Sequence, residues 1–137
     1  ASENASFGLS EVRWSLIASG GGLSYIMRNI PRAIAMRMIL TGEHIDAQEA
    51  YRIGLINEIV PQNKLLPRAI EIARVIGQNG PLAVSTSKET AIRGMDLPLD
   101  KSFILEDQLA ARVSKTNDNK EGPTAFTQKR RPKYLGE

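Results

Sequence analysis

Three groups of residues have the types and spacing that could perform chemistry. Glu11 is a carboxylate placed after a turn, where it could act as a general acid or base. Residues 20–22 are three consecutive glycines ahead of an apolar segment, and backbone amides at a helix N-terminus favour negative charge. Residues 129–133 include four cations that could bind phosphate. Each group also has a plain structural interpretation: a solvated carboxylate, a tight turn and a solvated helix end.

The composition excludes several kinds of site. The 137 residues include no cysteine, which excludes disulfides, thiolate nucleophiles and cysteine zinc sites and fits a reducing compartment. His44 is the only histidine, and no G-x-S-x-G nucleophile elbow is present. We therefore expect no metal, and we interpret His44 as an exposed loop residue between Gly42 and Asp46.

The net charge of +3 comes from the C-terminal end. Residues 1–119 contain 13 basic and 13 acidic side chains, whereas residues 120–137 contain five basic and two acidic ones. A basic patch can bind nucleic acid, but here only Phe126 and Tyr134 accompany one short cluster. We expect no nucleic-acid partner.

The sequence shows no sign of membrane insertion or export. No apolar run approaches the ~20 residues of a membrane-spanning helix, and residues 1–4 lack the basic and apolar regions of a signal peptide. We therefore expect a cytoplasmic protein with no membrane partner. Because the chain begins with Ala1 rather than Met, we also expect that it was processed or cut from a longer protein.

The apolar pattern predicts a mostly helical chain. Residues 7–14 indicate a short extended segment that turns, and residues 55–60 indicate a short strand between Gly54 and Pro61. Two strands cannot form an independent sheet, so the chain is either an unusual helical protein or the C-terminal part of a longer α/β protein. Helices are expected at residues 23–27, 31–40, 47–53, 65–76, 81–93, 98–115 and 120–130.

Local signals predict several helix ends. Gly42 is placed as the left-handed residue that ends the helix before it. Asp46 and Glu49 have the spacing of a capping box, as do Asp118 and Glu121. The apolar stripe expected in the helix at residues 98–115 consists of Leu99, Phe103, Leu109 and Val113.

Eight short motifs follow one another along the whole chain. They are Ala1-Ser2-Glu3 with Ala5, Phe7-Gly8-Leu9-x-Glu11, the turn at residues 20–22, Ala33-x-Ala35-Met36 with residues 39–42, Ile45-x-Ala47-x-Glu49-Ala50, residues 54–61, residues 80–84 with Lys88, and Glu121-Gly122-x-x-Ala125-Phe126-x-x-Lys129-Arg130. In order and spacing these motifs resemble the C-terminal half of the crotonase superfamily, the enoyl-CoA hydratases and isomerases. The tail at residues 121–132 looks most like bacterial hydratases, including those acting on carnitine-type acyl-CoA substrates.

The resemblance implies an α/β fold in which this predominantly helical segment is the C-terminal part of a crotonase spiral of ββα turns. Residues 1–60 would be the end of the spiral core and would include acyl-pocket residues. Residues 61–137 would be the C-terminal helical cap and oligomerisation region. The implied protein partners are the missing N-terminal half of the fold and further copies, as a homo-oligomer that is a trimer or a dimer of trimers.

The reaction implied by the resemblance is the reversible hydration of 2-enoyl-CoA thioesters, through an oxyanion-stabilised enolate, in fatty acid metabolism. Glu11 matches one of the family's two catalytic glutamates. The other glutamate and the amides of the oxyanion hole belong to the part of the family upstream of Ala1. One oxyanion-hole donor commonly contributes ~10²–10³ in rate, so we expect the segment alone to be inactive. No cofactor is expected, because coenzyme A is part of the acyl-CoA substrate.

The resemblance also implies substrate-binding residues. Ser19, Gly20 and Gly21 match a loop beside the acyl pocket, and the structural alternative is a tight turn. Trp14 and Tyr25 could narrow that pocket or could be core or interface residues.

The C-terminal helix resembles the family's coenzyme A contact. Phe126 and Lys129 match a phenylalanine and a lysine that lie beside the CoA of a neighbouring subunit. The sequence departs from the family at Ala18, where proline is frequent, and at Ser19, where glycine or aspartate is frequent, so substrate preference stays open.

Other functions remain open on sequence grounds. An enoyl-CoA isomerase or a carnitine-type acyl-CoA dehydratase would use the same enolate stabilisation. A non-catalytic crotonase-like protein could act by assembly or RNA binding. The chain could also be a clipped or split product whose N-terminal half is a separate polypeptide.

Overall fold

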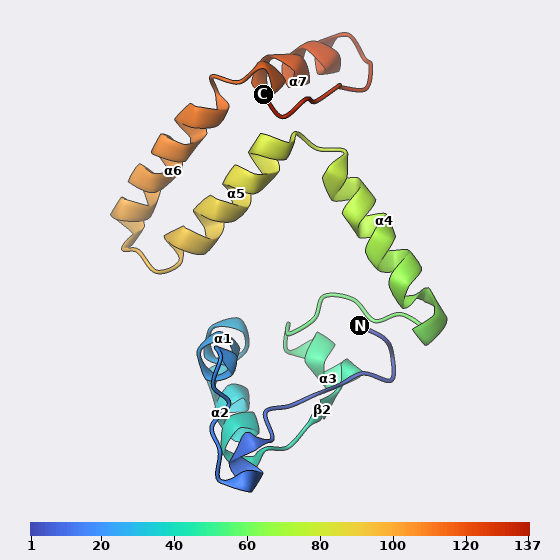
Figure 1. Cartoon of the computed structure of the whole chain (residues 1–137), viewed down its shortest axis with the longest axis vertical. Helices are drawn as coiled ribbons and strands as arrows, with labels where there is room; N and C mark the ends of the chain where they lie inside the picture. Colours follow the sequence, from blue (N-terminus) through green and yellow to red (C-terminus); the bar gives the residue numbers. More distant parts are fainter. The chain divides into compact units, whose positions relative to one another are not determined.

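The computed structural model describes residues 1–137, and the chain divides into two compact units, Ala1–Ile70 and Glu71–Glu137. Most of the chain is helical, as the apolar pattern predicts (Figure 1). No helix is both long and apolar enough to span a bilayer. In chain order the elements are β1 (Ser6–Phe7), the 3₁₀ helix η1 (Glu11–Trp14), α1 (Gly22–Asn29), α2 (Arg32–Thr41), β2 (Ile45–Asp46), α3 (Ala47–Arg52), the 3₁₀ helix η2 (Gln62–Lys64), α4 (Leu65–Gly77), α5 (Pro81–Gly94), α6 (Leu99–Val113) and α7 (Asn117–Thr127).

A small apolar core holds the first unit together. Ala35 and Met38 lie on one face of α2 and are fully or almost fully buried. Ile30 and Ile53 complete the buried cluster. Gly42 ends α2 in the left-handed region, at φ +66°, which is as predicted. The partly buried residues packed against this cluster are Ile26, Met27, Ile34, Ile45 and Leu55.

The strands of the first unit differ from the prediction. β1 pairs antiparallel with β2, so Ser6 faces Asp46 and Phe7 faces Ile45. The strand predicted at residues 55–60 is wrong. A ladder needs a neighbouring strand, and here only the N-terminal residues run alongside, giving the single parallel bridge between Ser2 and Val60.

Residues 7–14 are predicted to form a short extended segment that turns; the extended part ends at Phe7 and the chain does turn after it. Residues Glu11–Trp14 form the 3₁₀ helix η1. Two short-range hydrogen bonds close it, because the Arg13 amide donates to the Ser10 carbonyl at 3.1 Å and the Ser15 amide donates to the Val12 carbonyl at 3.2 Å. These contacts run between residues three apart, so no alternation pattern signals them.

α3 begins as its sequence predicts. The Asp46 carboxylate accepts a hydrogen bond from the Glu49 amide at 2.8 Å, which satisfies a donor that the first turn leaves free. The Glu49 side chain does not accept a hydrogen bond from the Asp46 amide, so the second hydrogen bond of the predicted capping box is absent. It accepts two hydrogen bonds from the Arg52 guanidinium instead, and this partner lowers the pKa of Glu49.

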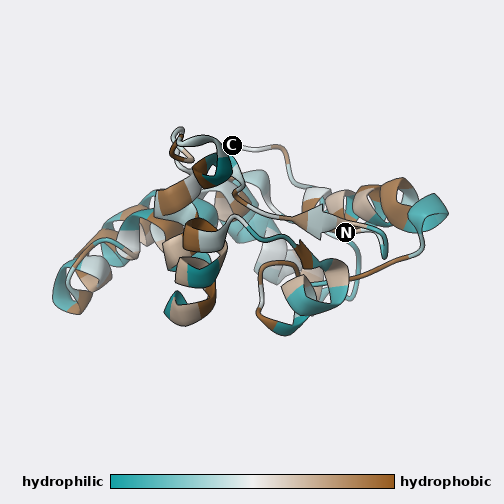
Figure 2. Ribbon diagram, turned by 90° about the horizontal axis from the view of Figure 1, so that it is seen from below, coloured by the Kyte–Doolittle hydropathy of each residue, from teal (hydrophilic) through white to brown (hydrophobic).

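In the second unit, α5 and α6 pack together as a helical hairpin, in which Leu105 and Leu109 are the buried residues of α6. The predicted stripe is therefore only partly right, because Leu99 and Phe103 remain exposed. Figure 2 shows hydrophobic and hydrophilic positions alternating along the helices. No residue of α4 is buried, although this helix is as amphipathic as its sequence predicts.

The start of α7 corrects a predicted cap. The Thr116 side chain accepts a hydrogen bond from the Asn119 amide at 3.1 Å, so α7 begins at Asn117. The sequence predicted Asp118 as the cap and a helix over residues 120–130. Asp118 fails as a cap because its carboxylate accepts hydrogen bonds from residues near the C-terminus instead.

The cap assignment predicts that Thr116→Ala lowers the free energy of unfolding by ~1 kcal/mol, because the Asn119 amide loses its acceptor. Urea denaturation measures this change. Thr124→Ala is the matched control, since this hydroxyl only donates to the Lys120 carbonyl within the helix. Equal losses in the two variants would contradict the assignment.

Candidate active site

Glu11 stands at the first position of η1, and the backbone around it is fixed by a left-handed residue. Ser15, at φ +56°, reverses the chain directly after η1. The amide of Leu16 then returns to the Glu11 carbonyl at 3.1 Å. This closed turn fixes the backbone at Glu11 without sheet pairing.

The Glu11 carboxylate has one oxygen without a partner. Its Oε2 is shielded from solvent and has no hydrogen bond, and it is the only buried side-chain polar atom of the chain in this condition. A buried acceptor with no partner costs about 1–3 kcal/mol, and more for a charged group. Such a cost is typical of a group that is kept for chemistry, because a substrate or water can then take the free acceptor position.

The glycine run forms the predicted turn before a helix. Gly20 and Gly21 have φ of +72° and +101°, values that residues with a side chain rarely adopt. The Gly21 carbonyl accepts a hydrogen bond from the Tyr25 amide at 2.8 Å, which begins α1. At Gly22 a Cβ would lie 3.3 Å from side-chain atoms of Leu9 and Ala18, so the backbone approaches them closely. The structural interpretation of this run is therefore confirmed.

Both aromatic residues of this region are exposed. Trp14 is 77% exposed and Tyr25 is 70% exposed, so neither is a core residue of this chain. Leu16 and Ile17 are exposed as well. These four side chains are free to contact a substrate or another part of the protein.

A shallow groove of about 220 Å³ passes beside the glycine turn. It brings Tyr25 together with Gly22, whereas Glu11, Trp14 and Ser19 do not line it. The Tyr25 ring covers Gly21 so closely that a Cβ there would lie 2.7 Å from the ring. The other residues that line the groove are Leu9, Ile26, Asn29, Gly54 and Leu55.

His44 has a structural place. It is exposed, as predicted, and its Nδ1 lies 3.3 Å from the Ser6 hydroxyl. Its ring lies against Gly8, where a Cβ would come within 2.1 Å of it. The contact connects the loop before β2 to the segment that leads into Glu11.

At the C-terminal end of α7, the helix finishes in a Schellman motif. The Arg130 amide donates to the Ala125 carbonyl and the Lys129 amide donates to the Phe126 carbonyl, both at 3.1 Å. Lys129 occupies the left-handed position of this motif at φ +52°, where glycine is the usual residue. Phe126 is 86% exposed. The two residues predicted to contact CoA therefore lie side by side on one exposed turn.

The other two charged residues of the same sequence motif, Glu121 and Arg130, bind each other. The two Arg130 Nη atoms donate to the two Glu121 carboxylate oxygens at 2.6 and 2.8 Å, and the Lys133 amide donates to Glu121 Oε1 at 2.7 Å. The Arg130 guanidinium and then the Lys133 amide lower the pKa of Glu121 to about 2. The pKa of Arg130 is raised by the same contact.

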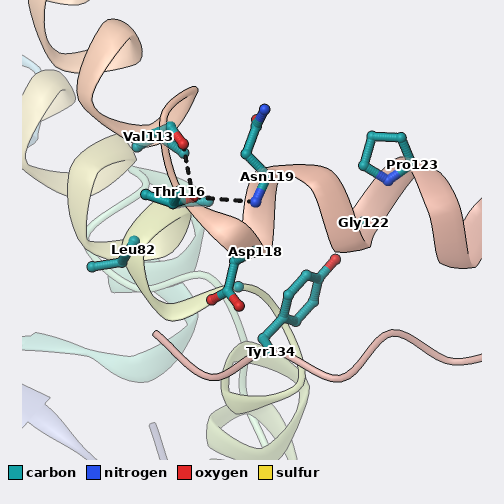
Figure 3. A pocket seen from close by; sticks show the side chains of 10 residues that line it. Leu82, Val113, Thr116, Asp118, Asn119, Gly122, Pro123 and Tyr134 are labelled. Carbon is teal, nitrogen blue, oxygen red and sulfur yellow. Dashed lines mark hydrogen bonds between the residues drawn. The ribbon is translucent and has the colours of Figure 1, made fainter. Parts of the chain in front are cut away.

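Sequence reasoning missed the residues that hold the C-terminus in place. Asp118 is buried, and its two oxygens accept hydrogen bonds from the amides of Leu135 and Gly136 at 2.8 and 2.9 Å. Tyr134 lies beside Asp118 in a pocket of about 220 Å³ between α5, α7 and the end of the chain, with its hydroxyl directed at Gly122 (Figure 3). The only available signal was Asp118 itself, an acidic residue close to a helix start, and it indicated a cap.

Comparison with known proteins gives these sites a context. The family model described as enoyl-CoA hydratase/isomerase matches residues 1–137. Enoyl-CoA hydratase EchA19 of Mycobacterium tuberculosis is 40% identical over 134 residues, which are 98% of this chain and 50% of that protein. (E)-Benzylidenesuccinyl-CoA hydratase of Thauera aromatica is 40% identical over 136 residues, 99% of this chain and 53% of that protein.

Solved structures agree with the sequence comparison. An enoyl-CoA hydratase from Bacillus anthracis superposes with a TM-score of 0.97 and 41% identity over 100% of this chain and 53% of that one. The chain belongs to the enoyl-CoA hydratase/isomerase family, which confirms the resemblance to the crotonase superfamily and the expected fold class. The chain spans about half the length of the relatives that it matches.

The low pKa of Glu121 predicts a pH-dependent contribution to stability. Because the pKa is lower in the folded chain than its ordinary value of 4.5, the contribution is present above pH 4.5 and disappears as the pH falls through about 2. Glu121→Gln should therefore be less stable than wild type at neutral pH, and the difference should close between pH 4.5 and 2. Denaturation across this pH range measures it, with Asp107→Asn, an exposed carboxylate of α6, as the control. A difference independent of pH would contradict the prediction.

Proposed function

We propose that the protein containing this chain catalyses the reversible hydration of 2-enoyl-CoA thioesters. The observation that carries the proposal is the free Oε2 of Glu11, in a chain of the enoyl-CoA hydratase/isomerase family. The relatives named above are hydratases of CoA thioesters, which favours hydration over isomerisation.

In this reaction the water oxygen bonds to the β-carbon, and a proton is delivered to the α-carbon. A carboxylate with a free acceptor can take the proton from water, or return one to carbon when protonated, so Glu11 is assigned this acid–base role. A second carboxylate and the oxyanion-hole amides would come from outside residues 1–137. Paired carboxylates can divide the two roles when their environments separate their pKa values.

The coenzyme A of the substrate is assigned to the exposed turn at the end of α7. Lys129 makes no ion pair within the chain, so its ammonium can form charge-assisted hydrogen bonds with a phosphate. Phe126 offers an exposed ring beside it. Arg130 is paired with Glu121, which reduces the free charge of the basic cluster and favours one small anionic ligand over nucleic acid.

The assembly and the location are part of the same proposal. Exposed apolar residues along α4 support a homo-oligomer, a trimer or a dimer of trimers, whose subunits contribute Phe126 and Lys129 to a neighbour's CoA. The acyl pocket would include Ser19, Gly20 and Gly21 with the exposed Trp14 and Tyr25. We place the protein in the cytoplasm and in fatty acid metabolism, with no metal and no separate cofactor.

Replacement of Glu11 tests the reaction. In the whole protein, Glu11→Gln should lower kcat for hydration of 2-butenoyl-CoA by ~10²–10⁴, because the amide cannot exchange a proton, while KM changes little. Loss of the thioester's ultraviolet absorbance measures the rate.

Two further samples make the test specific. Residues 1–137 alone should show no turnover, and Glu3→Gln, an exposed carboxylate in the whole protein, should keep full activity. Normal activity of Glu11→Gln would contradict the assigned role.

The turn at Lys129 predicts a trade between stability and substrate affinity. Lys129→Gly should raise the free energy of unfolding by about 1 kcal/mol, because glycine removes left-handed strain. The same change should raise KM for acyl-CoA about tenfold, since one charge-assisted contact to phosphate is lost. Lys129→Ala should raise KM equally without the gain in stability. Thermal unfolding and initial rates measure both quantities, and an unchanged KM in both variants would contradict the CoA contact.

A further inference from the structure

We propose that Asp118 and Glu121 are positioning residues for the CoA phosphate contact, acting through residues 130–137, the C-terminal strap. In this proposal, which rests on the proposed function, the two carboxylates hold the strap against α7 and thereby fix the backbone at Lys129. Neither carboxylate touches the ligand.

Lys129 is the apex of a chain reversal. α7 reaches it from one side, ending at Thr127, and the strap leaves from the other. The Lys129 amide donates to the Phe126 carbonyl at 3.1 Å, but no hydrogen bond or ion pair within the chain holds its ammonium. The position of the ammonium therefore depends on the backbone at the apex, and that backbone has the strained φ of +52°.

Glu121 fixes the beginning of the strap. It lies two turns before Lys129 on α7 and accepts the two Nη donors of Arg130, the residue directly after the apex. It also accepts the amide of Lys133. The Glu121 carboxylate therefore connects α7, which precedes Lys129, to the strap, which follows it. The two parallel contacts also fix the orientation of the Arg130 guanidinium.

Asp118 fixes the end of the strap. Its two oxygens accept the amides of Leu135 and Gly136, and its own amide donates to the Glu137 carbonyl at 3.1 Å. Tyr134 is held between these contacts, with its ring against Gly80 and its hydroxyl 3.2 Å from where a Cβ on Gly122 would lie. The strap therefore returns along α7 almost to the start of the helix.

These contacts matter for binding because they order the turn before a ligand arrives. A lysine on a loose C-terminal segment would lose backbone freedom on binding phosphate, and that loss would weaken the affinity. A turn held at Arg130, Lys133 and Leu135 has already lost this freedom. The benefit concerns ground-state binding of CoA, so it should affect KM and leave kcat unchanged.

A double-mutant cycle tests the proposal in the whole protein. Glu121→Gln and Asp118→Asn should each raise KM for 2-butenoyl-CoA by roughly fivefold, with kcat unchanged. In a Lys129→Ala background, neither change should raise KM further, because the ammonium that the strap positions is absent. Calorimetric titration with free CoA should show the same pattern in Kd. Asp107→Asn, an exposed carboxylate of α6, is the control.

The outcomes separate the possible failures. Equal increases in KM in both backgrounds, or a fall in kcat, would assign the carboxylates a general structural role and overturn the proposal. An unchanged KM in Asp118→Asn and Glu121→Gln would also overturn it. A wild-type protein that binds CoA but hydrates no enoyl thioester would overturn the proposed reaction, while the cycle in Kd would still decide the role of the strap.

Discussion

The left-handed backbone conformation is the constraint on which the candidate site depends. Ser15 turns the chain after Glu11, Gly20 and Gly21 turn it before α1, and Lys129 turns it after α7. Two of these four positions are glycines, which adopt the conformation freely. At Ser15 and Lys129 a side chain is kept in spite of its cost. Ser15 closes the turn that contains Glu11, and Lys129 is itself assigned to CoA.

The C-terminal motif shows how residues that stand together in sequence serve different purposes. Ala125 is buried, Gly122 leaves room for Tyr134, and Glu121 pairs with Arg130. Of the six residues that define the motif, only Phe126 and Lys129 remain exposed without side-chain partners in the chain. A ligand contact and the structure that supports it are therefore encoded in one short stretch, and only their geometry separates them.

The sequence predicts features that depend on neighbouring residues. The left-handed end at Gly42, the Asp46 cap and the helix at residues 81–93 are all present, with small shifts of their ends. The predictions of features that depend on residues distant in the sequence were wrong. The strand at residues 55–60 has almost no neighbouring strand, and Asp118 is engaged by amides 17 and 18 residues away instead of capping α7.

The features of the candidate site also divide into those that local sequence determines and those that distant residues determine. The glycine turn follows from local backbone preference, so the sequence was enough to predict it. The exposed Trp14 and Tyr25 could not be distinguished from core residues, because exposure depends on what the rest of the fold covers. The unpartnered oxygen of Glu11 is a property of its surroundings, and no spacing in the sequence indicates it.

The contact between His44 and Gly8 constrains how this family member can diverge. A Cβ at position 8 would overlap the His44 ring, so a side chain there requires the ring to move or a smaller residue at position 44. The two positions are therefore coupled, and position 8 lies on the path of the chain into Glu11.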